Sequence, residues 1–325
     1  MKRISLIFLG CAALVLAAAQ YQQVAKYQLG GEGSWDYLTL DQASHRLYVS
    51  HSAQLHVLDS VSGAVIGSVP AQGMHGIALA TEFGRGYISN GGADNAEVVD
   101  LATLKVVGEI PTGKKPDAVL YDPATKQVFV NNGDSESSTV IRASDGKVAG
   151  TVALGGAPEA SVSDGKGMVY TNLEEKSEIV KIDARQLKVV ARWKVAPCEA
   201  PAALAMDAGS RRLFAGCRNK MMAMVDADTG KVVTTRPIGD HVDAAVFAAD
   251  LKLLYLSNGD GTVNIFRLDS PSTVTPVETV RTQAGAKTMA LDGKTHRIYV
   301  STADYEPGGG RKVKPGSFKV LVYGN

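Results

Sequence analysis

The chain has 325 residues, of which 45% are hydrophobic, 21% are charged and 6% are aromatic, and it contains 34 glycines. This composition supports a large buried core and excludes a disordered or collagen-like chain. The formal net charge is +1 at pH 7, so no global electrostatic field favours binding to nucleic acid or to an anionic membrane.

The first 19 residues have the pattern of a secretory signal peptide. Lys2 and Arg3 give a basic start, residues 4–16 are apolar, and small residues lead to Ala19. The apolar run is too short for a membrane anchor. We therefore expect cleavage near Ala19 and a periplasmic or secreted mature protein. Lipoprotein processing at Cys11 is the alternative, but it would leave almost no hydrophobic segment before that cysteine.

From residue 20 onward the chain repeats one unit of four predicted strands. Polar turns separate apolar alternations, and the third strands close at intervals of 41 to 43 residues. An even period of this size with four strands per unit is typical of a β-propeller. The second strands of seven copies end in related segments at 48–51, 87–90, 129–132, 170–172, 214–217, 255–258 and 299–302.

The last unit ends at residues 318–323 with its third strand and has no fourth strand after it. The segment at 24–31 resembles the fourth strand at 148–156, so we expect it to pair with the last blade and cover its exposed edge. The sequence therefore predicts an all-β, seven-bladed β-propeller with four-stranded antiparallel blades. The ring is closed by the N-terminal strand of the mature chain, and residues 20–325 form a single domain.

The repeated strand ends, followed by Val-x-Asp and Thr-Gly-Lys-Val-Val segments, resemble the YVTN-repeat β-propellers of the YncE-like family. The similarity extends over the whole mature chain, and its most specific stretches are 74–79, 196–199 with 216–220, and 315–322. The resemblance implies an exported seven-bladed propeller with WD-like repeats. Some members of that family are associated with DNA or with the cell envelope, and the resemblance supplies no catalytic residues.

Polar residues gather at one predicted end of the central channel. The blade-to-blade connections and the loops between second and third strands should meet there, at the channel mouth, where closed β folds bind ligands. The alternative is that Asn and Asp side chains at these positions only satisfy loop backbone groups. The binding candidates are Asp36, His75, Asn90, Asp117, Asn132, Glu159, Asn172, Arg218, Asn219, His241, Asp243, Asn258 and Lys287.

Carboxylates at this end are also candidate metal ligands. Asp117, Glu159 and Asp243 would suit Ca²⁺ or Mg²⁺, which prefer oxygen ligands. Such an ion could polarise a carbonyl group, so that lactone hydrolysis or elimination becomes feasible with His75 or His241 as acid or base.

Cys198 and Cys217 are the cysteines that remain after signal cleavage. An even pair in an exported protein suggests a disulfide. Cys198 precedes the first strand of the fifth unit and Cys217 ends its second strand, so antiparallel pairing brings both to one end of the blade. Two free thiols or a metal pair are the alternatives.

Basic residues at the predicted mouth could form a rim for DNA, although aromatic partners are few and solvated loop charge is the alternative explanation. This basic set is Lys114, Lys115, Arg218, Lys220, Lys287, Arg311, Lys312 and Lys314.

Common hydrolase, zincin and phosphate-binding motifs are absent from the sequence. We therefore expect a non-catalytic, monomeric binding or scaffolding propeller that recognises a small molecule, peptide or envelope polymer at the channel mouth. A metal-dependent lactonase or lyase is the second hypothesis, and a DNA-binding envelope propeller is the third.

Overall fold

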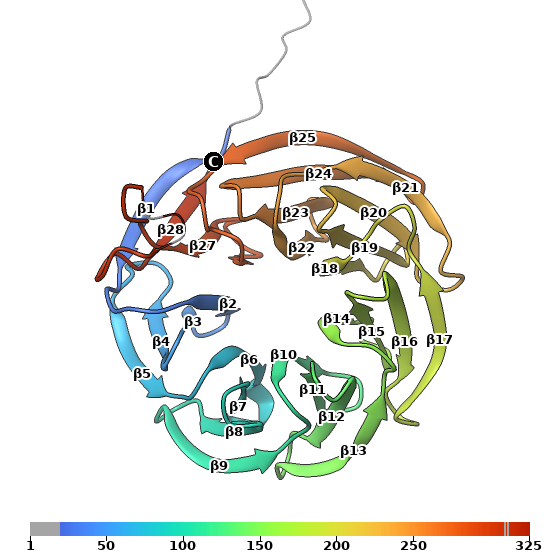
Figure 1. Cartoon of the computed structure of the whole chain (residues 1–325), viewed down its shortest axis with the longest axis horizontal. Coiled ribbons are helices and arrows are strands. Elements are labelled where there is room, and N and C mark those ends of the chain that lie inside the picture. Colours follow the sequence, from blue (N-terminus) through green and yellow to red (C-terminus); the bar gives the residue numbers. More distant parts are fainter. Residues whose placement is uncertain (1–19, 309, 311) are drawn as a thin grey trace, which may run out of the picture.

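The computed structural model describes residues 20–308, 310 and 312–325, so the predicted signal peptide lies outside the described residues. Seven four-stranded antiparallel sheets surround a central axis as the blades of a propeller (Figure 1). The predicted fold class is therefore confirmed. The one helical element of the described residues is the 3-10 turn η1 (Thr81–Phe83), and none of their helices is long and apolar enough to cross a membrane.

The first six blades each run outward from the axis in chain order. Blade 1 contains β2 (Trp35–Asp41), β3 (Arg46–His51), β4 (Gln54–Asp59) and β5 (Val65–Pro70). Blade 2 contains β6 (Met74–Ala80), β7 (Arg85–Asn90), β8 (Asn95–Asp100) and β9 (Lys105–Pro111). Blade 3 contains β10 (Pro116–Asp122), β11 (Gln127–Asn132), β12 (Ser137–Arg142) and β13 (Lys147–Ala153).

The next three blades repeat this order. Blade 4 contains β14 (Pro158–Ser163), β15 (Met168–Leu173), β16 (Glu178–Asp183) and β17 (Lys188–Lys194). Blade 5 contains β18 (Pro201–Asp207), β19 (Arg212–Cys217), β20 (Met221–Asp226) and β21 (Val232–Pro237). Blade 6 contains β22 (Val242–Ala248), β23 (Leu253–Asn258), β24 (Thr262–Ser270) and β25 (Thr273–Arg281).

Blade 7 joins the two ends of the chain. Its inner strands are β26 (Met289–Leu291), β27 (Ile298–Thr302) and β28 (Lys319–Gly324), and its outer strand is β1 (Gln22–Gln28). β1 pairs antiparallel with β28, from Gln22 opposite Gly324 to Gln28 opposite Lys319. The predicted closure of the ring by the N-terminal strand is thus present, and it covers an edge that would otherwise expose unpaired backbone groups.

The core lies between neighbouring blades, where the aromatic residue of each repeated strand end is buried. Tyr87 in blade 2 donates a hydrogen bond of 2.9 Å from its hydroxyl to the Ala143 carbonyl of blade 3. Tyr170 in blade 4 donates one of 3.1 Å to the Ala227 carbonyl of blade 5. A buried tyrosine needs such a partner for its hydroxyl. The repeated tyrosines therefore both fill the spaces between blades and join one blade to the next.

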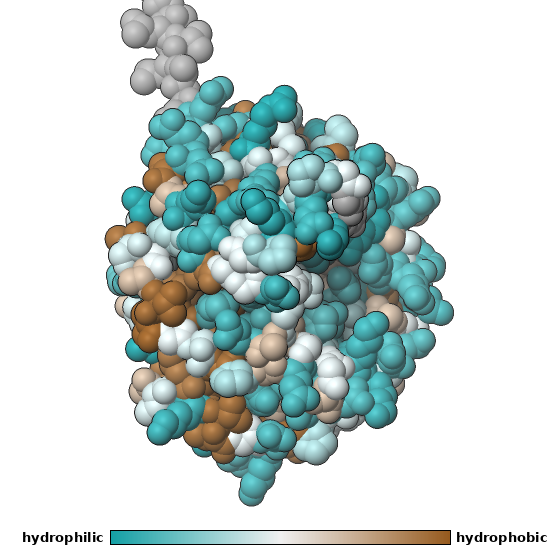
Figure 2. All heavy atoms as spheres, turned by 60° about the vertical axis from the view of Figure 1, so that its left-hand side comes forward, coloured by the Kyte–Doolittle hydropathy of each residue, from teal (hydrophilic) through white to brown (hydrophobic). Residues whose placement is uncertain are grey.

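The outer strands end the blades and face solvent. The pairing between the third and fourth strands contains a register shift in blades 1, 2 and 3. In blade 1 the shift lies between Val57 and Leu58. Such bulges twist an edge away from further strand pairing. Figure 2 brings one side of the ring forward and shows brown side chains among a mostly teal surface. Exposed apolar residues of the first two outer strands are Val65, Ile66, Val106 and Val107.

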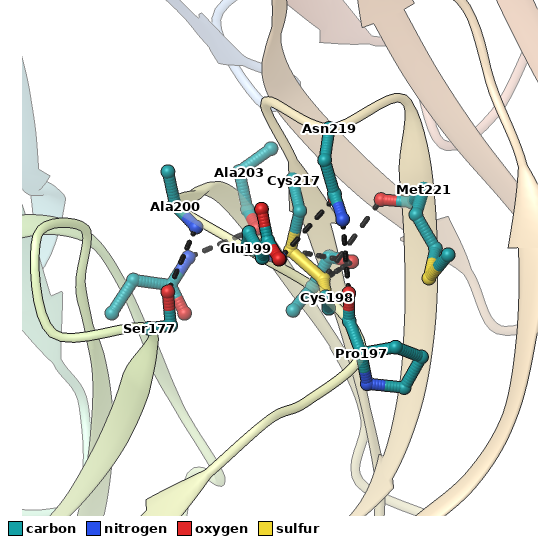
Figure 3. The surroundings of a disulfide bond; sticks show 11 residues. Ser177, Pro197, Cys198, Glu199, Ala200, Ala203, Cys217, Asn219 and Met221 are labelled. Carbon is teal, nitrogen blue, oxygen red and sulfur yellow. Dashed lines mark hydrogen bonds between the residues drawn. A yellow bond between two sulfur atoms is a disulfide. The ribbon is translucent and has the colours of Figure 1, made fainter.

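Cys198 and Cys217 form the predicted disulfide, with their Cα atoms 5.7 Å apart (Figure 3). Both cysteines are fully buried. The bond ties the connection before β18 to the end of β19, as expected from the antiparallel pairing of these strands. Closing a loop of this length stabilises a protein by roughly 3 kcal/mol in the chain-entropy model.

Candidate functional site

The innermost strands bring one residue of every blade to the same level of the channel mouth. The positions are equivalent because each lies two residues before the inner-strand residue that pairs with the same position of the second strand. In the first three blades these pairing residues are Leu38, Ile77 and Val119. We call this set the mouth ring. Its members are Asp36, His75, Asp117, Glu159, Ala202, Asp243 and Lys287.

A β-bulge lies at this level in the first six blades. In blade 1, Trp35 pairs with His51 and Leu38 pairs with Val49, so residues 36 and 37 share one partner position. The same extra residue occurs in blades 2, 3, 4, 5 and 6. Bulges re-aim side chains and are frequent beside binding sites. The repeated bulge explains how an inner strand presents a charged side chain at the mouth.

Asp36, His75 and Asp117 form the closest group of the ring. His75 Nδ1 lies 2.7 Å from an Asp36 carboxylate oxygen and 3.5 Å from an Asp117 carboxylate oxygen. Burial alone would lower the pKa of His75, but the hydrogen bond to Asp36 and the charges of Asp117 and Asp36 raise it above its ordinary value. The imidazole is therefore held by two carboxyl groups from the neighbouring blades.

Asp243 and Lys287, from blades 6 and 7, form an ion pair in the part of the ring beside Asp36. Lys287 Nζ lies 2.5 Å from Asp243, and Arg218 Nη2 lies 3.3 Å from the other oxygen of the same carboxylate. Arg218 also contacts Glu174 through Nε at 2.9 Å. Arg218 comes from the β19–β20 loop and supplies a charge in the blade where the ring position is Ala202. Asp243 is only 6% exposed and is neutralised by two cations.

Among the described residues, Glu159 lacks such compensation, and Asp117 has only His75, at 3.5 Å. The nearest cation to the Glu159 carboxylate is Arg218 Nη2, at 4.0 Å, which is beyond hydrogen-bond distance. Burial, together with the charges of Asp117, Glu174 and Asp243, raises the pKa of Glu159 to about 9. Burial also raises the pKa of Asp117 to about 6, although His75 opposes the shift. This part of the ring therefore disfavours negative charge and would gain from a bound cation.

Two hollows meet the ring. One is a cavity of about 170 Å³ inside the channel, bounded by Tyr37, Asp243 and small residues of the inner strands. The other, of about 510 Å³, lies between blades 1 and 2 and is bounded by Asp36, His75 and the Gly91-Gly92 pair. Of the ring residues, Asp243 lines the first hollow, and Asp36 and His75 line the second, where a ligand could enter.

Tyr37 is a site residue that the sequence reasoning did not identify. It follows Asp36 at the bulge, where the equivalent residues of the next two blades are Gly76 and Ala118. Its ring packs closely against Gly76, where a Cβ atom would lie only 3.2 Å from the ring. Burial and the carboxyl groups of Glu159, Asp117, Asp36 and Asp243 raise its pKa well above 10. Aligning the seven repeats at this position would have shown one large residue among small ones.

The predicted asparagines of the strand ends lie inside the blades rather than on the mouth surface. All four are completely buried. Asn132 Nδ2 donates to Ser137 and Thr139 within its own blade, at 3.2 Å and 3.0 Å. These contacts hold Asn132 inside the blade, although they go to side-chain hydroxyls rather than to the loop backbone groups of the alternative explanation. The buried set is Asn90, Asn132, Asn172 and Asn258.

Asn219 and His241 lie outside the mouth ring. Asn219 Nδ2 donates to the Pro197 carbonyl at 2.9 Å, and its Oδ1 accepts from the Glu199 amide at 3.2 Å, beside the disulfide (Figure 3). His241 Nδ1 lies 3.2 Å from Asp240 in an exposed connection. Of the predicted candidates, the structure therefore brings together Asp36, His75, Asp117, Glu159, Arg218, Asp243 and Lys287.

The basic residues predicted as a rim for DNA are largely paired with acids. Arg311 lies outside the described residues. The pairs, with their N···O distances, are Lys114–Asp94 at 2.7 Å, Lys115–Asp134 at 3.9 Å, Lys220–Asp240 at 2.9 Å and Lys312–Glu306 at 2.8 Å. Neutralised side chains give a weak field for a polyanion.

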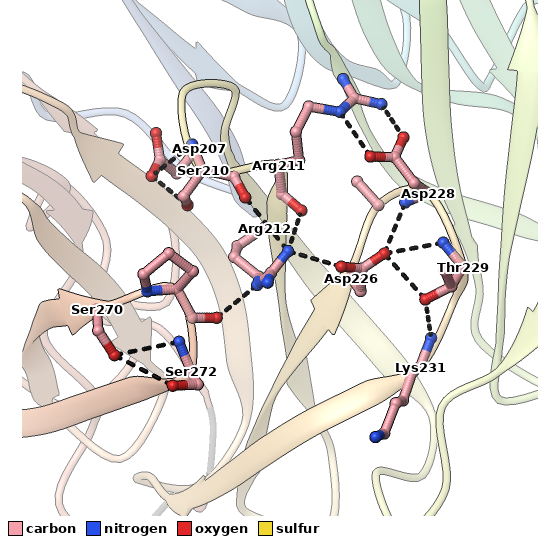
Figure 4. A network of polar contacts seen from close by, with 12 residues as sticks. Asp207, Ser210, Arg211, Arg212, Asp226, Asp228, Thr229, Lys231, Ser270 and Ser272 are labelled. Atoms are coloured by element: carbon pink, nitrogen blue, oxygen red, sulfur yellow. Dashed lines mark hydrogen bonds and ion pairs between the residues drawn. The ribbon is translucent and has the colours of Figure 1, made fainter.

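The opposite end of the ring has a different charge arrangement. Arg211 binds Asp228 at 2.6 Å and Arg212 binds Asp226 at 2.7 Å (Figure 4). Arg211 also binds Asp164 at 2.9 Å. These residues lie in or beside hairpin turns, and each of these acids has an arginine within hydrogen-bond distance. Glu159 at the mouth, by contrast, has no cation of the described residues within hydrogen-bond distance.

The fold is that of a seven-bladed β-propeller, and solved structures share its arrangement. Three solved structures show this likeness: "Crystal Structure of Mitotic Checkpoint Complex" matches with a TM-score of 0.78 and 12% identity over 100% of this chain and 99% of the other. "Crystal structure of RRP9 WD40 repeats" gives a TM-score of 0.77 and 10% identity, over 94% and 100%. "Structure of U3-55K" gives 0.75 and 10%, over 94% and 98%.

At these identities the likeness concerns the fold alone. No family model matches the chain, and no curated protein matches its sequence. The resemblance to YVTN-repeat propellers therefore stays a prediction from the sequence.

Proposed function

We propose that the mature protein is an exported, non-catalytic binding or scaffolding propeller whose ligand or partner presents a positively charged group to the channel mouth. The likeness in fold to solved structures, one titled as WD40 repeats and one titled as a complex, supports the class. Export rests on the signal-peptide pattern of residues 1–19.

One observation supports the charge of the ligand above all others. Glu159 and Asp117 are about four-fifths buried beside further carboxyl groups, and no cation of the described residues lies within hydrogen-bond distance of Glu159. Uncompensated buried carboxyls are costly to a fold. A cationic ligand would supply the missing positive charge. Ligand binding would therefore explain why these carboxyl groups are present, whereas folding stability does not.

The test is a thermal-shift measurement on mature protein, residues 20–325, in metal-free buffer. The probes are agmatine, a small dication, and succinate, a small dianion, and divalent cations are tested in a separate series. We expect a cation to raise the melting temperature by mass action and succinate to have no effect.

Two variants test whether the shift in melting temperature arises from binding at the mouth ring. Asp117→Asn removes a ring carboxyl and should abolish the shift, whereas Asp134→Asn removes an exposed carboxyl of the same face and should retain it. The proposal is contradicted if no cation stabilises the protein, or if the shift persists in Asp117→Asn.

A second candidate function is favoured by the hydrogen bond between Asp36 and His75. A carboxylate that orients an imidazole is a common arrangement for acid–base catalysis. Lactone hydrolysis or elimination would then occur at the mouth. Turnover of a panel of lactones, lost in His75→Gln, would favour the enzyme over the binding protein.

A further inference from the structure

We propose that Asp36, His75 and Asp117 bind one divalent transition-metal ion at the channel mouth. The inference rests on the proposed function, because it names the cation that the mouth ring takes. It keeps Asp117 from the sequence-based metal hypothesis, replaces Glu159 and Asp243 with Asp36 and His75, and changes the class of ion.

The three residues have the spacing of a metal site. The Nδ1 atom of His75 and one carboxylate oxygen each of Asp36 and Asp117 all lie within 4.8 Å of one another. Neighbouring ligand atoms around an ion with bonds of about 2.1 Å are roughly 3.0–3.5 Å apart, close to the 2.7 Å and 3.5 Å between His75 Nδ1 and the two carboxylates. The residues come from equivalent positions of three consecutive blades, so rigid strands hold each of them.

The donor set selects the type of ion. Ca²⁺ and Mg²⁺ take oxygen ligands, whereas an imidazole nitrogen beside two carboxylates suits Zn²⁺ and Mn²⁺. Burial of the group strengthens the attraction between carboxylates and ion, since less water screens the charges.

The three carboxylates of the sequence-based metal hypothesis, Asp117, Glu159 and Asp243, have different interaction partners in the structure. Asp243 is committed to Lys287 and Arg218, so an ion there would have to displace two cations. Asp117 belongs to the trio, and Glu159 is the next residue along the ring.

Neighbouring residues fix the trio. Thr288 Oγ1 donates to the Asp36 backbone carbonyl at 2.8 Å. The His75 ring lies close over Gly91, where a Cβ atom would approach its Nε2 to 2.9 Å. Such supporting contacts set ligand orientation and hence metal affinity.

The hollow between blades 1 and 2 reaches Asp36 and His75. An ion with only three protein ligands keeps open coordination positions. A ligand group entering this hollow could occupy one of them, so the ion would act as the docking point for the ligand of the propeller.

The experiment is isothermal titration calorimetry on untagged mature protein that has been stripped with chelator. ZnCl₂ and MnCl₂ are the test titrants and CaCl₂ is the comparison. We expect saturable binding of one Zn²⁺ or Mn²⁺ per chain and weaker binding of Ca²⁺.

Four variants test the ligands. Asp117→Asn and His75→Gln should each weaken the metal affinity at least about tenfold. Asp134→Asn and His296→Gln, which change an exposed carboxyl and a histidine that pairs with Asp250, should bind as the unchanged protein does. Circular dichroism shows whether each variant is folded, and a misfolded Gln variant is replaced by His75→Asn.

The outcomes separate this inference from the proposed function. Absence of saturable metal binding, or binding unchanged in both ring variants, overturns the metal site. Tighter binding of Ca²⁺ than of Zn²⁺ and Mn²⁺ overturns the class of ion. If agmatine stabilises the protein while the metals do not bind, the metal site falls and the proposed function stands.

Discussion

Asp243 and Glu159 occupy equivalent positions in the mouth ring and illustrate two situations for a buried carboxyl group. Asp243 accepts hydrogen bonds from Lys287 and Arg218 and is almost completely buried. Glu159 has no cation within hydrogen-bond distance. A carboxylate of the first kind holds its partners in place, whereas one of the second kind is costly unless it is protonated or meets a ligand.

Substitution of Asp243 should therefore destabilise the fold. Asp243→Asn leaves Lys287 without its closest partner, and we expect a loss of about 3 kcal/mol in the free energy of unfolding. Asp240→Asn, which breaks the exposed pair with Lys220 on the same face, should change it little. Urea unfolding of both variants measures the difference, and equal losses would show that the Asp243 contacts contribute no more than a surface pair.

At the scale of the element, β1 determines whether the ring is closed. Tyr27 of β1 is buried, and its ring contacts Gly63 of blade 1, where a Cβ atom would overlap it. Its hydroxyl donates to the carbonyls of Ser60 and Val61, each at 3.0 Å. One side chain of the first strand thus joins the last blade to the first.

This closure predicts unequal effects along one strand. Tyr27→Ala should cost about 3 kcal/mol, because it removes a buried aromatic ring and its hydrogen bonds. Val24→Ala changes a side chain of the same strand that is 49% exposed, and it should have little effect. Thermal melts of both variants are the measurement, and a Tyr27→Ala protein as stable as Val24→Ala would rule out closure by β1.

The repeat could be predicted from the sequence because the same strand pattern occurs seven times along the chain. The closing strand and the cysteine pair followed from counting strands and from antiparallel pairing. The position of Glu159 at the mouth could be expected for the same reason. These inferences depend on topology, which a period of 41 to 43 residues specifies well.

The direction of each polar side chain could not be predicted in the same way. Asn132 and Asp117 both lie at the mouth end of blade 3, yet Asn132 turns into the blade and Asp117 does not. The bulge between Pro116 and Val119 causes this difference, and no residue type in the sequence indicates the bulge. Arg218 and Tyr37 gain their roles only when neighbouring blades are placed side by side.

At the scale of the whole molecule, the two ends of the ring differ in how their charges are balanced. Arg211 and Arg212 compensate Asp164, Asp226 and Asp228 at the hairpin end. At the mouth, carboxyl groups outnumber the basic groups that reach them. Charge retained against stability is common at functional sites, and this asymmetry is the central claim of the proposed function.

The most direct test is the stability of Glu159→Gln against pH, measured as melting temperature in metal-free buffer. The folded pKa of about 9 lies above the ordinary 4.5, so the folded state binds the proton more tightly and stability falls as pH rises between these values. Glutamine cannot ionise and escapes that loss. We predict that Glu159→Gln is more stable than the unchanged protein by up to about 5 kcal/mol at pH 8, a rise of several degrees, and that the difference is small at pH 4.5. A variant that melts below the unchanged protein at pH 8 would show that the Glu159 carboxylate supports the fold through Arg218, and would contradict the account.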